Sequence, residues 1–241
     1  MSLIKIVPRK EVNIRDDIPQ TWEELFTRNK NTLEKIFNKI EPIKIPLPVD
    51  VFEAYHITPL PFVRVVIIGE DPYPTTDNLT KLPHAKGLSF SYSRKQGFSR
   101  SMENVKKELE RTYPGIVLSH SCLTSWAYQG VLLLNTSLTF SSKEEKSANI
   151  ALWKDFIDET IKEILSVNPE CIFVAWGLKA KTLLAKFQIK NLLTSVHPSP
   201  RNFTGGFVGN NHFKRINEIL VAKGEYPIDW NLRIVGTPKK R

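Results

Sequence analysis

Four short runs of apolar residues, separated by helical patterns, constrain the fold of this chain more than any other feature. Each run is continuous instead of alternating, as expected of strands that are buried on both faces of a sheet. The runs cover residues 65–68, 131–134, 171–175 and 192–196. Helical patterns cover 99–113, 151–166, 178–187 and a segment after 210. This alternation predicts an α/β fold with a central four-stranded, mostly parallel sheet and helices on both faces.

The residues before the first run predict a helical and then an irregular segment. Apolar side chains recur at helical spacing over 21–40, after a capping box formed by Thr21 and Glu24, so a helix with a break is expected there. Five prolines between 41 and 62 predict an irregular path apart from a short helix near 51–55. The chain therefore divides into an extended arm (1–20), a single domain (21–232) and a basic tail (233–241).

Polar side chains follow three of the four runs. The segment GEDPYP begins at Gly69, NTS at Asn135 and HPSP at His197. In a parallel sheet, ligands bind beyond the carboxyl ends of the strands, so these loops form the candidate site. Taken singly, each residue is better explained by a structural role: Asp71 as a turn residue, Asn135 as a strand-end cap and His197 as a satisfied histidine. Their convergence at one sheet edge favours a functional site.

Charge, hydrophobicity and the Cys and His content limit the classes of function that are possible. The formal net charge of +9 is compatible both with a nucleic-acid partner and with an ordinary solvated surface. No apolar run is long enough to span a membrane, and the first residues do not have the form of a secretion signal, so an intracellular, soluble protein is expected. The two cysteines are expected to be buried and reduced, and the five histidines lack paired ligand spacing. No metal is therefore expected.

Five motifs in order establish a resemblance to a known family. They are GEDPYP, GLSFS, GVLLLNTSLT, HPSP followed by GGFVGNNHF, and PIDWNL, and they extend over about residues 60 to 232. This succession closely resembles family 1 uracil-DNA glycosylases, which have a four-stranded parallel sheet. The resemblance implies a DNA-repair enzyme that flips uracil out of DNA and hydrolyses its N-glycosidic bond without a cofactor, leaving an abasic site.

The resemblance also implies roles for the residues of the base pocket. Asp71 matches the carboxylate that orients the attacking water and stabilises the cationic sugar, and His197 matches the donor to uracil O2. Phe90 matches the aromatic residue that stacks on the flipped base. Asn135 matches the amide that pairs with N3–H and O4 of uracil, and the ring of Tyr73 matches the group that blocks the thymine methyl group.

The segments expected to contact DNA depart from the family pattern. Glutamate replaces glutamine at Glu70, whose backbone N–H is expected to serve the uracil while its side chain faces solvent or a lysine. Pro74 replaces a histidine, and Arg201 replaces the leucine wedge, as in the divergent enzymes of poxviruses. Ser101 and Ser199 match serines that bind phosphate near a helix amino terminus.

Two functions remain as alternatives at this point. The first is an active uracil-excising enzyme, and the second is a DNA-binding replication accessory or processivity subunit with weak or no activity. The complete uracil-recognition set favours the enzyme, and Tyr73 disfavours a relative that acts on mismatched thymine. The expected partners are uracil-containing single- or double-stranded DNA and replication proteins. We expect a monomer, in the nucleus or the cytoplasm.

Overall fold

A parallel four-stranded sheet forms the centre of the computed structural model, which describes residues 19–40, 51–79, 82–92, 98–140, 144–200 and 205–233. The strands are β1 (Val65–Gly69), β2 (Val131–Asn135), β3 (Ile172–Trp176) and β4 (Asn191–Ser195), in the spatial order β2-β1-β3-β4. All three strand pairs are parallel. The predicted fold class is confirmed, and each strand lies within one residue of its apolar run. The arm before Pro19 and the tail after Arg233 lie outside the described residues.

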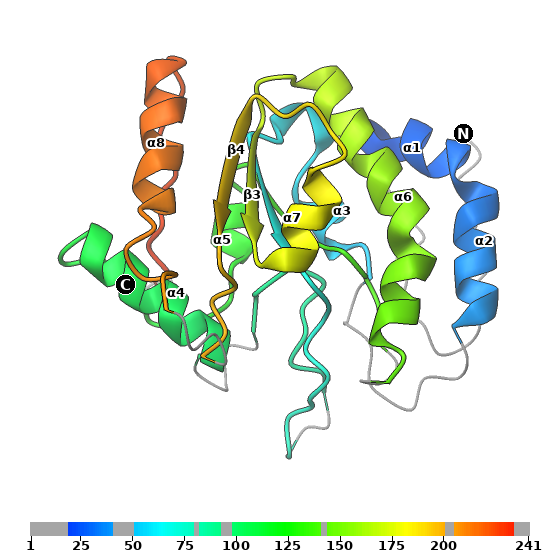
Figure 1. Cartoon of the computed structure of the whole chain (residues 1–241), viewed down its shortest axis with the longest axis horizontal. Coiled ribbons are helices and arrows are strands. Elements are labelled where there is room, and N and C mark those ends of the chain that lie inside the picture. Colours follow the sequence, from blue (N-terminus) through cyan, green and yellow to red (C-terminus); the bar gives the residue numbers. More distant parts are fainter. Residues whose placement is uncertain are drawn as a thin grey trace, which may run out of the picture.

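Helices cover the sheet on its two sides, with α4 and α8 on one and α6, α1 and α2 on the other (Figure 1). None of the helices within the described ranges is both long and apolar enough to cross a membrane. The helices are η1 (Gln20–Trp22), α1 (Glu23–Arg28), α2 (Lys30–Lys39), α3 (Glu53–Ile57), η2 (Leu60–Phe62), α4 (Arg100–Thr112), α5 (Thr124–Ala127), α6 (Lys146–Val167), α7 (Leu178–Leu184) and α8 (His212–Ala222).

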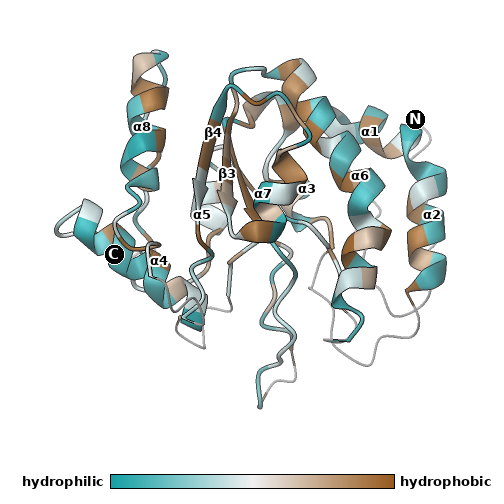
Figure 2. Ribbon diagram, viewed as in Figure 1, coloured by the Kyte–Doolittle hydropathy of each residue, from teal (hydrophilic) through white to brown (hydrophobic). Residues whose placement is uncertain are grey.

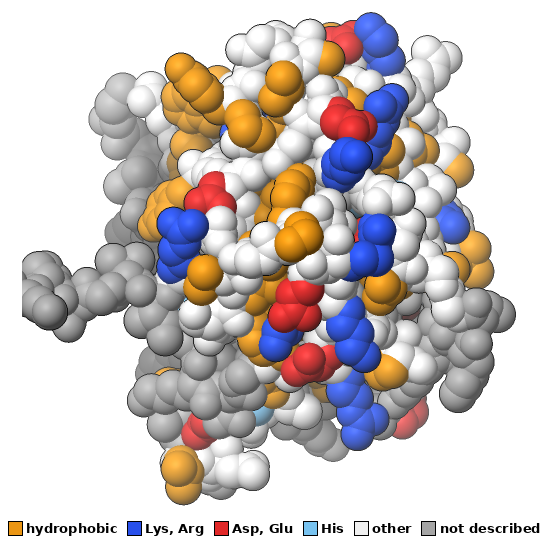
Figure 3. Space-filling view, turned by 90° about the vertical axis from the view of Figure 1, so that its left-hand side faces the viewer, with side chains coloured by type: hydrophobic (Ala, Val, Ile, Leu, Met, Phe, Trp, Pro, Cys, Tyr) orange, Lys and Arg blue, Asp and Glu red, His pale blue; other side chains and the backbone are white. Residues whose placement is uncertain are grey.

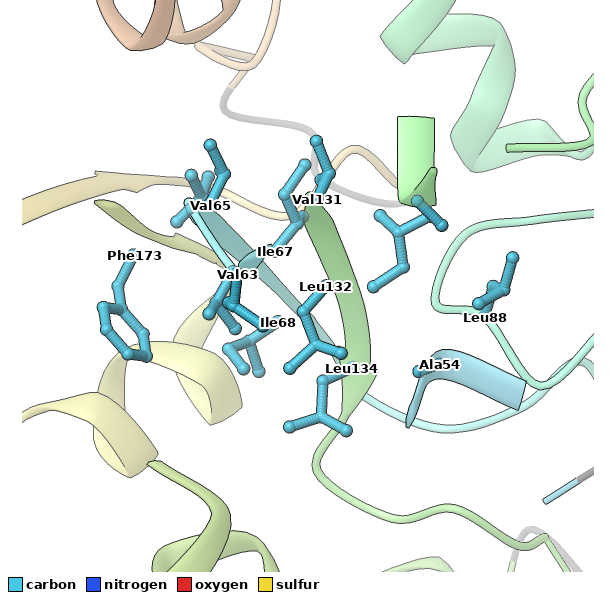
Figure 4. Packing of buried hydrophobic residues seen from close by; sticks show 14 of the residues in the cluster. Ala54, Val63, Val65, Ile67, Ile68, Leu88, Val131, Leu132, Leu134 and Phe173 are labelled. Carbon is cyan, nitrogen blue, oxygen red and sulfur yellow. The ribbon is translucent and has the colours of Figure 1, made fainter. Parts of the chain in front are cut away.

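The core lies between the sheet and its covering helices. Every residue of β1, β2 and β3 is buried, as predicted for these three runs. In β4, partly buried and exposed positions alternate and only the last residue, Ser195, is buried, so the expectation of burial on both faces is wrong for this strand. Figure 2 shows these strands as the most hydrophobic part of the ribbon, and Figure 4 shows side chains of β1 and β2 packed together, with Phe173 of β3 close by. The two cysteines are buried thiols that form no disulfide, as predicted. Burial of this apolar surface is the main favourable term in folding.

Two expectations about helix beginnings are wrong. The hydroxyl of Thr21 does not cap α1 but accepts a hydrogen bond from the backbone N–H of Leu60, 3.3 Å away. Helix α6 begins at Lys146, five residues before the predicted start at 151. Its first turn has few apolar side chains, so hydrophobic periodicity does not reveal it. The predicted break in 21–40 is confirmed at Asn29, between α1 and α2.

Candidate active site

A cavity of about 440 Å³ lies at the carboxyl edge of the sheet. Nine of the ten predicted site residues line it, contributed by the loops after β1 and β4, by the last residue of β2, by the segment before α4 and by the first turn of α4. The nine are Glu70, Asp71, Tyr73, Pro74, Phe90, Ser101, Asn135, His197 and Ser199. The tenth, Arg201, lies outside the described residues. Lys146 also lines the cavity, although it was not predicted as a site residue.

Gly69 allows Asn135 to lie in the cavity. The parallel register places Gly69 at the end of β1 directly opposite Asn135 at the end of β2. A Cβ atom added to Gly69 would overlap the side-chain oxygen of Asn135 and lie 2.8 Å from the Cβ of Ser89. The absence of a side chain at Gly69 therefore leaves room for the amide of Asn135, which is 7% exposed.

Phe90 is held in a strained backbone conformation. Its φ of 61° lies in the left-handed region, which is uncommon for a bulky residue. Its ring is 5.2 Å from that of Trp176 and 5.9 Å from the imidazole of His197, measured between ring centroids. Strain of this kind costs about 1–3 kcal/mol and is found mainly at functional sites. The strained conformation places an aromatic ring beside His197 at the wall of the cavity.

Tyr73 is fixed by two hydrogen bonds. Its hydroxyl donates to the backbone oxygen of Phe90 at 3.2 Å and is 2.7 Å from the hydroxyl of Ser99. Ser99 is also the N-cap of α4, because its side chain accepts from the backbone N–H of Met102 at 3.2 Å. Burial raises the pKa of Tyr73 to about 12, so the phenol is neutral at physiological pH. One serine therefore links the beginning of α4 to the orientation of Tyr73.

The imidazole of His197 has a defined neutral form. The backbone N–H of Ser199 donates to Nδ1 of His197 at 2.9 Å, so Nδ1 accepts and the ring proton of neutral His197 is on Nε2. Burial lowers the pKa of His197, and the nearby carboxylate of Glu70 opposes that shift only in part. The loop is tied to α4 by Asn104, whose amide donates to the oxygen of Pro198 at 2.8 Å. His197 is therefore a neutral hydrogen-bond donor through Nε2.

Glu70, Asp71 and Lys146 form a cluster of charges in the cavity. The Nζ of Lys146 lies 3.1 Å from a carboxylate oxygen of Glu70 and 3.2 Å from one of Asp71. The side chain of Glu70 was expected to face solvent or a lysine, and its pairing with Lys146 confirms the second of these expectations. Burial raises the pKa of Asp71 above its usual value. Lys146 opposes this shift, Glu70 adds to it, and the net effect is a raised pKa. Within the described ranges, no group of three or more His, Cys, Asp or Glu side chains is arranged to hold a metal.

A second buried carboxylate shapes the loop before α8. Glu108, on α4, is fully buried and accepts hydrogen bonds from the backbone N–H groups of Gly209 and Asn211, the latter at 2.8 Å. The guanidinium of Arg111 donates to the same carboxylate at 2.9 Å. Burial alone would raise the pKa of Glu108, but Arg111 and these N–H groups outweigh it and lower the pKa. This network joins α4 to the GGFVGNNHF segment predicted from the sequence.

Charge on the outer surface is mixed. Figure 3 shows Lys and Arg side chains interspersed with acidic ones on the side of the molecule where α4 and α8 lie. On α8, for example, Lys214 and Arg215 both lie within 4 Å of Glu218, at 3.9 and 3.4 Å. Exposed pairs of this kind contribute little to stability. On this side, basic side chains are therefore partly paired with acidic ones and do not form one continuous basic patch.

The fold and the cavity define a class of protein: a single-domain α/β protein with a carboxylate, a neutral imidazole and an amide at the carboxyl edge of a parallel sheet. Comparisons with known proteins identify the family. The uracil DNA glycosylase superfamily profile matches residues 56–221. A uracil-DNA glycosylase of Pseudomonas savastanoi pv. phaseolicola is 37% identical, over 96% of this chain and 97% of its own, and one of Shewanella oneidensis is 40% identical, over 76% and 83%.

A solved structure agrees with these relatives. The crystal structure of mimivirus uracil-DNA glycosylase superposes with a TM-score of 0.79 and 27% sequence identity, covering 88% of this chain and 86% of that one. The chain belongs to the uracil-DNA glycosylase superfamily, whose named relatives here are hydrolases of N-glycosyl bonds in DNA base-excision repair.

Proposed function

We propose that this protein flips uracil out of DNA into the cavity at the carboxyl edge of the sheet and hydrolyses the N-glycosidic bond, releasing uracil and leaving an abasic site. The reaction develops positive charge on the deoxyribose and negative charge on the departing uracil. A catalyst for it needs an anion near the sugar and a hydrogen-bond donor near the base. Asp71 and His197, both in this cavity, have those properties.

The observation that most strongly supports this proposal is the hydrogen bond from the N–H of Ser199 to Nδ1 of His197. It leaves Nε2–H as the donor of a neutral ring, and burial favours the neutral form. His197 donates this hydrogen bond to uracil O2 as negative charge develops there. Asp71 acts as an anion: it orients the attacking water and stabilises the cationic sugar.

The remaining cavity residues recognise the base and the backbone. Phe90 stacks on uracil, the amide of Asn135 pairs with N3–H and O4, and Tyr73 excludes the 5-methyl group of thymine. Cytosine presents the opposite donor and acceptor pattern, so it leaves buried groups unpaired at a cost of about 1–3 kcal/mol each. The backbone N–H of Glu70 contributes to uracil binding.

The rim of the cavity contacts the DNA backbone. Ser101 lies in the first turn of α4, where the helix dipole favours phosphate, and Ser199 lies beside His197. Pro74 lies at the same rim. The role of Arg201, which occupies the position of the family's leucine wedge, stays a prediction: its side chain stacks against the bases on either side of the flipped nucleotide. The changes at Pro74 and Arg201 thus alter the contact with DNA, and the base pocket is complete, which supports an enzyme over an accessory subunit.

The test is excision of uracil by two variants of the catalytic pair. Asp71→Asn and His197→Leu are each expected to lower turnover by about 100-fold or more, because each removes one transition-state stabiliser, while DNA binding is largely retained. Single-turnover incubation with a uracil-containing oligonucleotide, followed by alkaline cleavage at abasic sites, measures the rate. Near-normal turnover in either variant would contradict the assignment of that residue.

A further inference from the structure

Lys146 is a cavity residue that the function proposed above does not use. It is the first residue of α6, and its ammonium group lies 3.1 Å from Glu70 and 3.2 Å from Asp71. The side chain of Lys146 is 35% exposed, that of Glu70 27% and that of Asp71 17%. All three therefore lie in the mouth of the same cavity, where solvent screens their charges less than it does at the outer surface.

We propose that Lys146 is a positioning residue for uracil excision: its ammonium group holds the carboxylate of Asp71 in place and neutralises Glu70 beside it. This inference rests on the function proposed above. The cluster of one cation and two carboxylates carries a net charge of −1, the same charge as Asp71 alone. Lys146 thereby allows a glutamate to precede the catalytic aspartate.

Two adjacent carboxylates without a cation would impair this site in two ways. Like charges disfavour simultaneous ionisation, so Asp71 would lose its proton less readily, and burial already disfavours its charged form. An uncompensated Glu70 would also repel the negative charge that develops on uracil, because at about 4 Å two unit charges repel each other appreciably even in a polar protein environment. Lys146 opposes both effects.

The contacts of Lys146 favour this role over binding of a DNA phosphate. Its ammonium group already faces two carboxylates. Burial by itself lowers the pKa of Lys146, but attraction to Asp71 and Glu70 outweighs it and raises the pKa, so the side chain is charged at neutral pH. A phosphate would have to compete with both carboxylates. Two more titratable side chains line this cavity: His197, from the loop after β4, and Tyr73, from the loop after β1.

A set of variants tests the inference: Lys146→Met, Lys146→Arg, Glu70→Gln and the double variant Lys146→Met with Glu70→Gln. The matched control is Lys154→Met, since Lys154 is another α6 lysine, 3.1 Å from Asp158 on the helix surface. Single-turnover excision is measured at saturating enzyme on uracil-containing single-stranded DNA as a function of pH. DNA affinity and its salt dependence are measured separately, and thermal unfolding verifies that each variant folds.

Lys146→Met is expected to slow excision by about 10- to 100-fold and to move the acid limb of the pH–rate profile to higher pH, because the pKa of Asp71 rises. Glu70→Gln changes the rate less than about tenfold. The double variant is expected to be at least several-fold faster than Lys146→Met, and Lys146→Arg to retain most activity, because it keeps the cation.

Three results would overturn the inference. They are an unchanged rate and acid limb in Lys146→Met, a double variant no faster than Lys146→Met, and weaker DNA binding with an unchanged rate at saturating enzyme. The last result would make Lys146 a phosphate ligand. If Lys146→Met does not fold, the excision rate of Lys146→Arg decides in its place: because this variant keeps the cation, a rate more than tenfold below that of Lys154→Met contradicts the role. A wild-type protein without uracil excision would refute the proposed function itself.

Discussion

Replacing Gly69 with alanine tests whether the packing of β1 against β2 sets the position of the uracil-binding amide. The added Cβ would overlap the side-chain oxygen of Asn135 and lie 2.8 Å from the Cβ of Ser89. Non-bonded carbon atoms prefer about 3.5–4.0 Å, so Asn135 and Ser89 must move by roughly 1 Å. Displacements of about 1 Å in an active site cost up to about 100-fold in rate, and overpacking costs about 1–3 kcal/mol of stability.

The assay compares kcat/KM for uracil excision with the free energy of unfolding in urea. Gly69→Ala is expected to lose about 100-fold in kcat/KM while it remains folded at 25 °C. Gly224→Ala is the control: Gly224 has a φ of +75°, so alanine there is strained by about 1–2 kcal/mol, yet its Cβ meets no atom within 4 Å. This control is destabilised but should keep full activity. Wild-type kcat/KM in Gly69→Ala would refute the argument.

Two further predictions concern residues that support the site. Ser99→Ala removes the N-cap of α4 and a partner of Tyr73; it should lower stability by about 1 kcal/mol and raise excision of thymine relative to uracil, and an unchanged ratio would argue against this positioning role. Glu108→Ala leaves backbone N–H groups unpaired at about 1–3 kcal/mol each. The folded-state pKa of Glu108 lies below its unfolded value near 4.5. Its contribution to the free energy of unfolding is therefore present above that pH and is lost as the pH falls through the lower, folded-state pKa. Glu108→Gln should weaken this pH dependence of stability, as measured by acid unfolding.

The sequence by itself determined the sheet and the loops that bear the site. Continuous apolar runs indicate strands buried on both faces, and the four strands lie within one residue of those runs. Burial on both faces holds for β1, β2 and β3, whereas β4 is partly exposed. The carboxyl-edge rule then brings Asp71, Asn135 and His197 together without any knowledge of contacts. The resemblance to uracil-DNA glycosylases supplied the role of each residue, and it also showed that Glu70 is unusual.

Only the tertiary structure decided how these groups are held and charged. Lys146 lies 75 residues after Asp71 in a helical turn without apolar periodicity, so no sequence pattern places its ammonium group beside that carboxylate. Likewise, the tautomer of His197 depends on one backbone N–H, and the room for Asn135 depends on the strand register opposite Gly69. Apolar periodicity records which residues are buried, whereas hydrogen bonds and ion pairs between distant segments depend on distances of a few ångströms that exist only in the folded chain.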